Sequence, residues 1–425
     1  MDAVTHPRGS DTAVWPTTSL MLEQGHRRIH TTTGGVDSAE TGRAPGIVGS
    51  EFVRDGRILS PRTNDSVADE QPGVRSLREG DLAVVLVRRV GDSALVTSEH
   101  AGWPATRSIG IVRADPHVVR WLHIWLQTPT AKARIYEDVT AHVEPTTSLD
   151  TLRRMWFPLP PPDTVTAYHR VFGLIEEMAS VYRETARKAV RLADALHDER
   201  VSSGSPRDTR PLAAVAVLKT GKGSERSLTR SPSDATVDVV APKDLYDLPV
   251  PHVHRFRLSG QVGEGEAHPP GTLLVSTRGA DAHTVVTSRP AKPLRSVVAV
   301  RPLDDADVWW LLHELRSRSA DVAGRAQGEK GREISALALK RLEITWPDRF
   351  ARASFHRAVE PLHAAAKLLV SKIATLHALR DALLSDIAAK AGVLREPDAD
   401  REARGAGTST PLRSPDRARA ARGGR

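Results

Sequence analysis

The sequence predicts a mixed α/β protein with two related globular domains, each followed by one long helix. Two observations lead to this prediction. A set of landmark residues recurs in the same order roughly 190 residues further along the chain, and two long segments carry apolar residues at alternating three- and four-residue steps. The 425 residues are enough for two or three domains with cores of their own.

The landmarks indicate an internal duplication. Five pairs keep their order with offsets of 187 to 191 residues: Gly80 and Gly271, Gly91 and Gly279, Trp121 and Trp310, Ser148 and Ser335, Pro160 and Pro347. The two glycines that open the pattern each precede an apolar strand. The two serines are expected to cap short helices, because a serine hydroxyl accepts a hydrogen bond from a free first-turn amide. A proline-containing strand follows each short helix and marks the exit from a domain.

The long helices are predicted at about residues 165–201 and 353–389, each as one continuous helix. Their apolar residues form a narrow stripe, which is typical of a coiled-coil seam. The alternative is that each helix packs only on its own domain. The residues expected to pair the helices are Tyr168, Phe172, Ile175, Tyr182, Phe355, Val359, Leu362, Leu369, Ile373 and Leu376.

These patterns give the expected limits of the domains. They are a disordered N-terminus (1–12), a first domain (13–161), a first helix (162–203), a second domain (204–348), a second helix (349–392) and a disordered basic tail (393–425).

Composition restricts the classes of function. The chain has no cysteine, which excludes disulfides, thiol nucleophiles and Cys-ligated zinc. The first ten residues lack the pattern of a signal peptide, and the apolar runs are too short to span a bilayer, so we expect a cytoplasmic protein. The net charge of +8 suits a polyanionic partner such as DNA, although +3 of it comes from the C-terminal tail.

No motif predicts catalysis or a bound cofactor. Gly260, Gly263 and Gly265 lack the strand and helix that a nucleotide-binding loop requires. The base-gripping Asn/Asp-Pro-Pro-aromatic motif of an adenine methyltransferase is also missing. His252 and His254 have no third ligand nearby, so we expect no metal site. We therefore expect the chain alone to transfer no methyl group and to cut no DNA.

Basic residues in polar stretches between apolar strands are the candidate DNA contacts. Arginine presents a planar fork that fits phosphate oxygens and guanine edges. The alternative is that these residues form an ordinary solvated surface. The candidates are Arg27, Arg28, Arg54, Arg57, Arg62, Arg88, Arg89, Lys219, Lys222, Arg226, Arg255, Arg257 and Arg278.

With the repeat in view, the sequence resembles the specificity (S) subunits of type I restriction–modification systems. The first half carries Leu77-Arg78-Glu79-Gly80-Asp81-Leu82, then Ser148-Leu149 with Leu152, and the strand Phe157-Pro158-Leu159-Pro160-Pro161. The second half repeats Gly271-Thr272-Leu273-Leu274-Val275, Glu333-Ile334-Ser335 and Trp346-Pro347, and ends with Leu379-Arg380-Asp381-Ala382-Leu383-Leu384. The resemblance covers about residues 15–390.

The resemblance implies a non-catalytic reader of a split DNA site. Each domain would be a target-recognition domain for one half-site, and the two helices would pair antiparallel as a spacer. DNA methyltransferase (modification) subunits carrying S-adenosylmethionine would dock on that spacer, and a restriction translocase-nuclease is a further partner. The alternatives are a two-domain interaction scaffold of a defence system that does not bind DNA, and an enzyme that acts alone.

Overall fold

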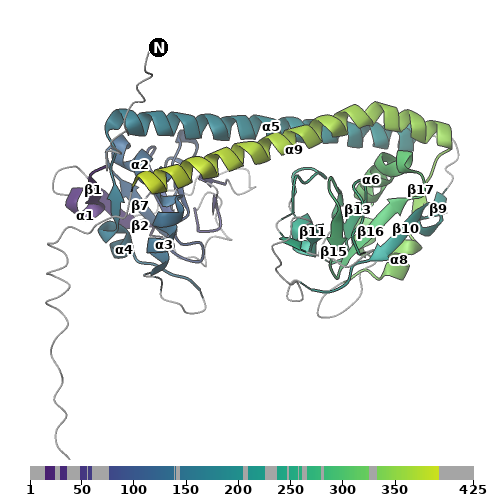
Figure 1. The fold of residues 1–425 in the computed structure, drawn as a ribbon, viewed down its shortest axis with the longest axis horizontal. Helices are drawn as coiled ribbons and strands as arrows, with labels where there is room; N and C mark the ends of the chain where they lie inside the picture. Colours follow the sequence, from purple (N-terminus) through teal and green to yellow (C-terminus); the bar gives the residue numbers. More distant parts are fainter. Residues whose placement is uncertain are drawn as a thin grey trace, which may run out of the picture. The chain divides into compact units, whose positions relative to one another are not determined.

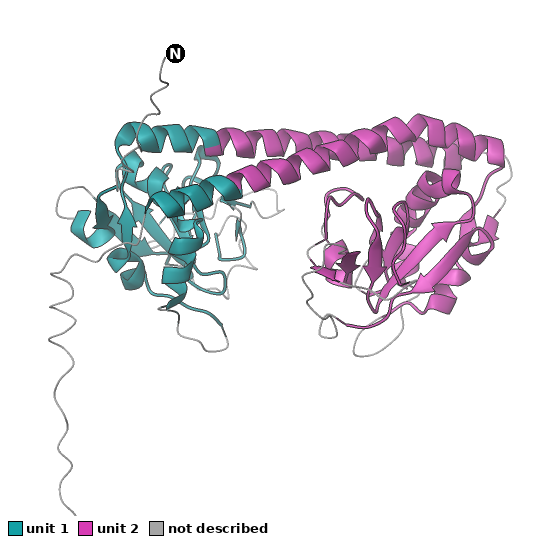
Figure 2. Cartoon of the chain, in the orientation of Figure 1, with its two compact units in different colours: residues 1–171, 381–425 teal, residues 172–380 magenta. Residues whose placement is uncertain are grey.

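A computed structural model describes the larger part of the chain. The described residues are 15–23, 29–35, 48–54, 56–59, 76–137, 139, 144–203, 209–224, 237–246, 248–256, 258–260, 266–278, 282–324 and 333–391. They belong to two compact units (Figure 2), unit 1 with residues 1–171 and 381–425 and unit 2 with residues 172–380. The predicted disordered ends, 1–12 and 393–425, lie outside the described residues.

Unit 1 contains a four-stranded antiparallel sheet. Its order is β2 (His30–Thr33), β7 (Ile109–Arg113), β5 (Leu82–Val85) and β6 (Ser93–Leu95). The fully apolar β5 is buried along its whole length. The helix α2 (Pro116–Leu126) follows β7 and places Trp121, Leu122 and Trp125 in the core.

Shorter elements complete unit 1. A strand near the start of the chain, β1, pairs antiparallel with the proline-containing strand β8, and β3 pairs with β4 as a small hairpin. Their bounds, with those of the remaining helices, are β1 (Thr17–Ser19), α1 (Leu20–Glu23), β3 (Val53–Arg54), β4 (Arg57–Ile58), a 3-10 turn (Ser98–His100), α3 (Pro129–Glu137), α4 (Leu149–Arg154) and β8 (Trp156–Pro158).

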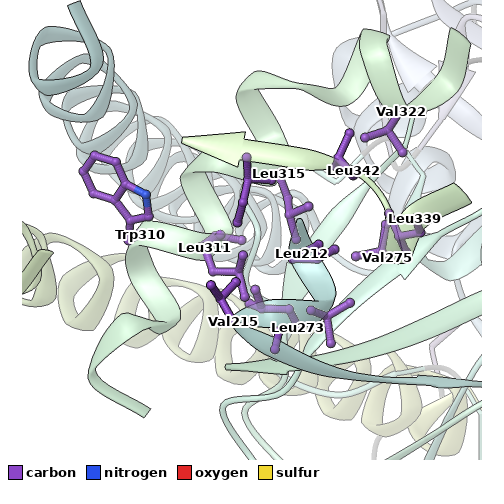
Figure 3. Close-up of a cluster of buried hydrophobic side chains, with 14 of the residues drawn as sticks. Leu212, Val215, Leu273, Val275, Trp310, Leu311, Leu315, Val322, Leu339 and Leu342 are labelled. Carbon is purple, nitrogen blue, oxygen red and sulfur yellow. The ribbon is translucent and has the colours of Figure 1, made fainter. Parts of the chain in front are cut away.

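Unit 2 repeats the same sheet. Its order is β10 (Ala216–Thr220), β16 (Val297–Pro302), β13 (Leu273–Ser276) and β14 (Thr284–Val286), again all antiparallel. Helix α6 (Val308–Ser317) packs against β14 and β16. Figure 3 shows the core of this unit, where Leu311 lies near Leu273 and Val215, and Trp310 lies at one edge of the cluster.

Two further features complete unit 2. Strand β9 (Thr209–Pro211) pairs with β17 (Glu343–Thr345) (Figure 1), as β1 pairs with β8. A second sheet has the order β12, β11, β15. The bounds of the other elements are β11 (Val237–Val240), β12 (Leu258–Gly260), β15 (Ala291–Pro293), α7 (Ser319–Gly324), α8 (Ala336–Lys340) and 3-10 turns at Leu212–Ala214, Pro242–Leu245 and Asp305–Asp307.

The predicted duplication and fold class are confirmed by this topology. In both units the N-cap serine accepts a hydrogen bond from the amide three residues on, 2.9 Å for Ser148 and 3.1 Å for Ser335. The indole of Trp310 donates to the carbonyl of Thr345 at 2.8 Å, and Trp121 donates to Pro158 in the same way. Each pair ties the helix after the sheet to the strand that precedes the long helix. In unit 1 this strand, β8, includes Pro158, whereas in unit 2 β17 ends two residues before Pro347.

The two long helices are α5 (Pro162–Ser203) and α9 (Arg349–Lys390), each of 42 residues. Within unit 2 their pairing is antiparallel: Glu176 binds Arg380 at 3.4 Å, and Arg200 lies over the ring of Phe355. As the residue number rises along α5, the number of its partner falls along α9. Ala186, Val190 and Ala366 form a buried cluster between these two ends.

The residues expected to pair the helices are also packed against the globular parts: Tyr168 lies beside the rings of Trp15 and Trp121, and Phe355 and Val359 belong to the core cluster of Leu273 and Trp310. Among the expected pairing residues, some are buried and the others half-buried. The buried ones are Phe172, Ile175, Phe355 and Val359, and the half-buried ones are Tyr168, Tyr182, Leu362, Leu369, Ile373 and Leu376. The apolar periodicity overlooked Pro361, which lies inside α9. Proline removes one amide donor from a helix, yet α9 continues for 29 residues beyond it, to Lys390.

Candidate nucleic-acid interface

In unit 1 the hairpin of β3 and β4 brings two candidate arginines together. Arg54 and Arg57 are direct cross-strand partners, with Gly56 at a φ of 80° in the turn between them. Arg54 is exposed and Arg57 half-buried. Like charges directly opposite each other in an antiparallel pair are unfavourable. The hairpin therefore brings two cationic side chains to one place in unit 1.

The guanidinium of Arg89 is directed at the protein's own backbone, whereas a DNA contact is expected to face solvent. Its guanidinium donates to the backbone carbonyls of Ser50 at 2.6 Å and Val53 at 2.7 Å. It also lies 3.5 Å from Asp92. Its donors therefore hold the segment that leads into the β3–β4 hairpin, and so Arg89 positions Arg54.

Arg88 follows strand β5 of the four-stranded sheet of unit 1. Its φ of 70° is in the left-handed region, which for a residue other than glycine costs about 1–3 kcal/mol. The guanidinium lies 2.8 Å from Glu144, with both side chains well exposed. The hydrogen bond and the charge of Glu144 raise the pKa of Arg88. Water screens this pair, so a phosphate could compete with Glu144 for the guanidinium.

In unit 2 a buried carboxylate stands between two arginines. Asp238, in β11, is 3% exposed, and its carboxylate oxygens lie 4.0 Å from Arg255 and 3.8 Å from Arg289. Burial raises the pKa of Asp238, against the opposing effects of the Phe256 amide and both arginines. Both guanidinium groups remain about half-exposed. Asp238 therefore holds two solvent-facing cations near the same point, which suits a bidentate contact with phosphate or a base edge.

Other basic residues of unit 2 lie at the edge of its main sheet. Lys219 is exposed on the edge strand β10, and Lys222 follows on the segment after it. The amide of Arg295, which is exposed, donates to the carbonyl of Gly223 at 3.2 Å, so Arg295 lies beside that segment. Arg278 is exposed, and its backbone carbonyl accepts a hydrogen bond from the Tyr246 hydroxyl.

The remaining candidates and two omissions complete the set. Arg27, Arg28, Arg62, Arg226 and Arg257 lie outside the described residues. The sequence interpretation missed Arg289 and Arg295. Both flank the short strand β15, whose proline-rich sequence gave no sign of a strand.

The described residues offer little for metal or membrane chemistry. Within the parts of the chain that are described, no three or more His, Asp or Glu side chains are arranged to hold a metal ion. His252 is buried whereas His254 is exposed, so the two do not share one environment. The helices of the described part include none with the length and hydropathy of a membrane span.

Comparisons with known proteins were made at three levels. No protein-family model matches the chain, and no curated protein matches it either. The solved structures that are similar in fold include the following three. An S subunit of a type I restriction–modification system from M. genitalium is 11% identical, with a TM-score of 0.49, over 88% of this chain and 96% of that one.

The other two neighbours have lower TM-scores. The HsdS subunit from Thermoanaerobacter tengcongensis is 17% identical, with a TM-score of 0.33, over 90% of this chain and 98% of that one. A chain from a structure describing complex assembly and conformational transition of the type I R-M system is 16% identical. Its TM-score is 0.40, and the match covers 92% of this chain and all of that one. The solved structures to which this chain is similar over most of its length thus include S subunits of type I restriction–modification systems.

Proposed function

We propose that this chain is a DNA sequence-specificity subunit that recognises a bipartite site and directs a partner DNA adenine methyltransferase to it. The observation that carries the proposal is the duplication. Two units repeat one sheet order, and each leads through a serine-capped helix and a short strand into a long helix. Two homologous readers joined by paired helices suit a site read as two separate halves.

The two recognition domains are residues 13–161 and 204–348 in this proposal. Modification subunits carrying S-adenosylmethionine would dock on the helices 162–203 and 349–392, and a restriction translocase-nuclease is a further partner. The chain itself would bind no cofactor and would work in the cytoplasm. Its role would be to position DNA, with phosphate contacts that set the register and a few side chains that read bases.

Arg255 and Arg289 are the proposed contacts of the second domain that the geometry supports best. The charge of Asp238 draws both guanidinium groups toward the same place, at 3.8 to 4.0 Å from its carboxylate oxygens. In the first domain the corresponding role is proposed for Arg54, Arg57 and Arg88. The other described candidates, Lys219, Lys222 and Arg278, would contribute mainly charge.

A gel shift with duplex DNA tests the proposal. The purified chain should bind random-sequence duplex, with an affinity that falls as salt rises. The double variant Arg255→Ala/Arg289→Ala should bind more weakly, and the slope of log K against log salt should become shallower by about 0.9 for each phosphate that is no longer neutralised. Lys188→Ala/Arg191→Ala removes the same charge from the exposed surface of α5 and is the matched control.

The outcomes separate the proposal from its alternative. A defence-system scaffold without a DNA role predicts no shift at any salt concentration. If both double variants weaken binding equally, the effect is one of net charge, and the assignment of Arg255 and Arg289 fails. Methylome sequencing of a host that expresses this chain with its genomic neighbours would then identify the recognised bases.

A further inference from the structure

Four side chains of unit 2 form one continuous hydrogen-bond chain. The carboxylate of Asp194 lies 2.7 Å from Nδ1 of His313. Nε2 of His313 lies 2.9 Å from Nε2 of His363, and Nδ1 of His363 lies 3.0 Å from Nε2 of His252. All three histidines are at least 97% buried.

The chain joins four separate segments. Asp194 belongs to α5, His313 to α6 and His363 to α9, while His252 lies in the loop after the 3-10 turn Pro242–Leu245. It therefore links both long helices to the helix and the loop that pack on the β-sheets of unit 2. We call Asp194, His313, His363 and His252 the histidine chain.

The direction of the hydrogen bonds is fixed by Asp194. Burial opposes its ionisation, but hydrogen bonds from His313 and Arg316 and the charge of Arg316 hold its pKa well below the usual range. An ionised carboxylate only accepts hydrogen bonds, so His313 must donate from Nδ1 and accept at Nε2.

The other two rings must follow the same direction. His363 donates from Nε2 to His313 and accepts at Nδ1 from Nε2 of His252. This leaves Nδ1 of His252 as a buried lone pair, and it has no hydrogen-bond partner among the described residues. Each ring can thus be neutral in only one tautomer.

Several titratable or charged groups lie on the elements that carry the histidine chain. Arg316 and the buried Glu314 lie on α6, Glu360 and Lys367 on α9, His197 on α5 and His254 in the loop. Glu314 is engaged by Arg318 at 2.5 Å and by the amide of Thr345 at 2.6 Å, and Trp309 donates to Glu360. These acids are therefore occupied by other partners.

The surroundings disfavour any charge on the three rings. Burial lowers the pKa of His252 to about 4, helped by the charges of Lys367 and Arg316. Burial also lowers the pKa of His363 and, despite Asp194, that of His313. Trp309 covers His363, with ring centroids 4.0 Å apart, and excludes water from that side.

We propose that the histidine chain is a proton-sensitive lock that fastens the β-sheet part of unit 2 to its two long helices. The lock is closed when all three rings are neutral and aligned in one direction. In the closed lock a further proton would have to enter a buried site. Once the histidine chain opens, the three imidazole rings reach water and take up protons freely. This proposal does not depend on DNA binding, so each of the two proposals can fail without the other.

The sign of the pH dependence follows from the lowered pKa values. Histidines that titrate near 6.5 when opened and well below that when closed bind more protons in the open form. The closed form is therefore fully stable above about pH 6.5 and loses stability as pH falls below it. A single ring with the pKa of His252 makes opening at least about tenfold more favourable at pH 5 than at pH 7.

Hydrogen–deuterium exchange of the full-length protein measures this opening locally. Peptides from residues 248–256 and 308–317 should lose at least tenfold in protection between pH 7 and pH 5, after correction for the intrinsic exchange rate. In His252→Gln/His363→Gln the amide groups can keep the donor and acceptor roles without titrating. The loss of protection should then be smaller than in wild type by at least about tenfold, and what remains is the contribution of His313.

A matched control and a milder variant complete the test. His254→Gln changes an exposed histidine two residues away and should behave as wild type. If the double variant does not fold, His252→Gln alone removes the terminal ring and should still reduce the pH effect. The proposal would be wrong if protection fell equally in wild type and in the folded glutamine variants, or did not fall in wild type. The histidine chain would then contribute only to packing.

Discussion

At the scale of single residues, two glycines have a role that the sequence did not reveal. Gly34 follows β2 and Gly221 follows β10, and their amides donate to Ile109 at 3.0 Å and Val297 at 2.8 Å. A Cβ on either glycine would come within 2.2 Å of a backbone carbonyl oxygen. Both units therefore need a residue without a side chain where the edge strand leaves the sheet.

We expect Gly221→Ala to destabilise unit 2 by about 1–3 kcal/mol, because the backbone it meets cannot move aside cheaply. Gly34→Ala should do the same in unit 1. Gly173→Ala is the control, since Gly173 lies in α5 and a Cβ added there would meet nothing within 4 Å. Alanine there should stabilise the helix by about 0.5–1 kcal/mol. Urea unfolding measures each change, and a neutral Gly221→Ala would refute the close-approach argument.

At the scale of elements, the antiparallel register of α5 and α9 identifies which heptads face each other. Tyr182 on α5 lies under the ammonium of Lys372 on α9, which is 5.5 Å from the ring centroid. Residues 182–188 therefore face a stretch of α9 that overlaps residues 369–375. Removal of both heptads should leave the apolar stripe in phase, since each deletion spans one full seam repeat.

This pairing makes the proposed spacer role testable. Deleting Tyr182–Lys188 and Leu369–Thr375 shortens each helix by roughly 10 Å, or about three base pairs of DNA. Three base pairs also rotate the duplex by about a quarter to a third of a turn. We expect the reconstituted methyltransferase to recognise a shorter spacer or to lose specific binding. Unchanged affinity for the original spacer, with a normal circular dichroism spectrum, would show that the helices do not set the distance.

The single-helix deletions are the controls for this experiment. Removing only residues 182–188, or only residues 369–375, leaves unequal helices whose facing residues no longer match. These variants should lose stability in the seam, whereas the double deletion should keep it. If all three deletion variants unfold alike, the helix register does not determine their stability. Insertion of two heptads into each helix then becomes the test of spacing.

At the scale of the whole molecule, the duplication predicts two independent readers. The units share a sheet order but differ in the residues that approach DNA in our proposal. Arg255 and Arg289 flank a buried aspartate in unit 2, whereas unit 1 presents Arg54 and Arg57 on a hairpin. Since base contacts come from such side chains, the two half-sites should differ in sequence.

Exchanging residues 204–348 for the equivalent part of a relative should therefore change one half of the methylated motif and leave the other intact. Methylome sequencing of a host with the chimaera and its methyltransferase partner gives the answer. The reciprocal exchange of residues 13–161 is the control and should change the other half. A motif altered in both halves, or in neither, would contradict the modular mechanism.

Features that depend on neighbours along the chain could be predicted from the sequence alone. The serine caps at Ser148 and Ser335 need only an amide three residues on, and the seam of α5 and α9 needs only a periodic apolar stripe. The repeat of glycine, tryptophan, serine and proline landmarks also survived the divergence of the two halves. These local signals were sufficient for the fold class and for the order of its parts.

Contacts between polar groups far apart in the sequence became visible only in the folded chain. Arg89 turns its donors inward to Val53, 36 residues away, and His252 meets His363 across 111 residues. The charge and spacing of residues in the sequence predict neither contact. An arginine in a polar stretch has the same sequence pattern whether its side chain faces solvent or a buried carbonyl. The pairing of such groups is fixed when the sheets and helices pack and every buried donor must find an acceptor.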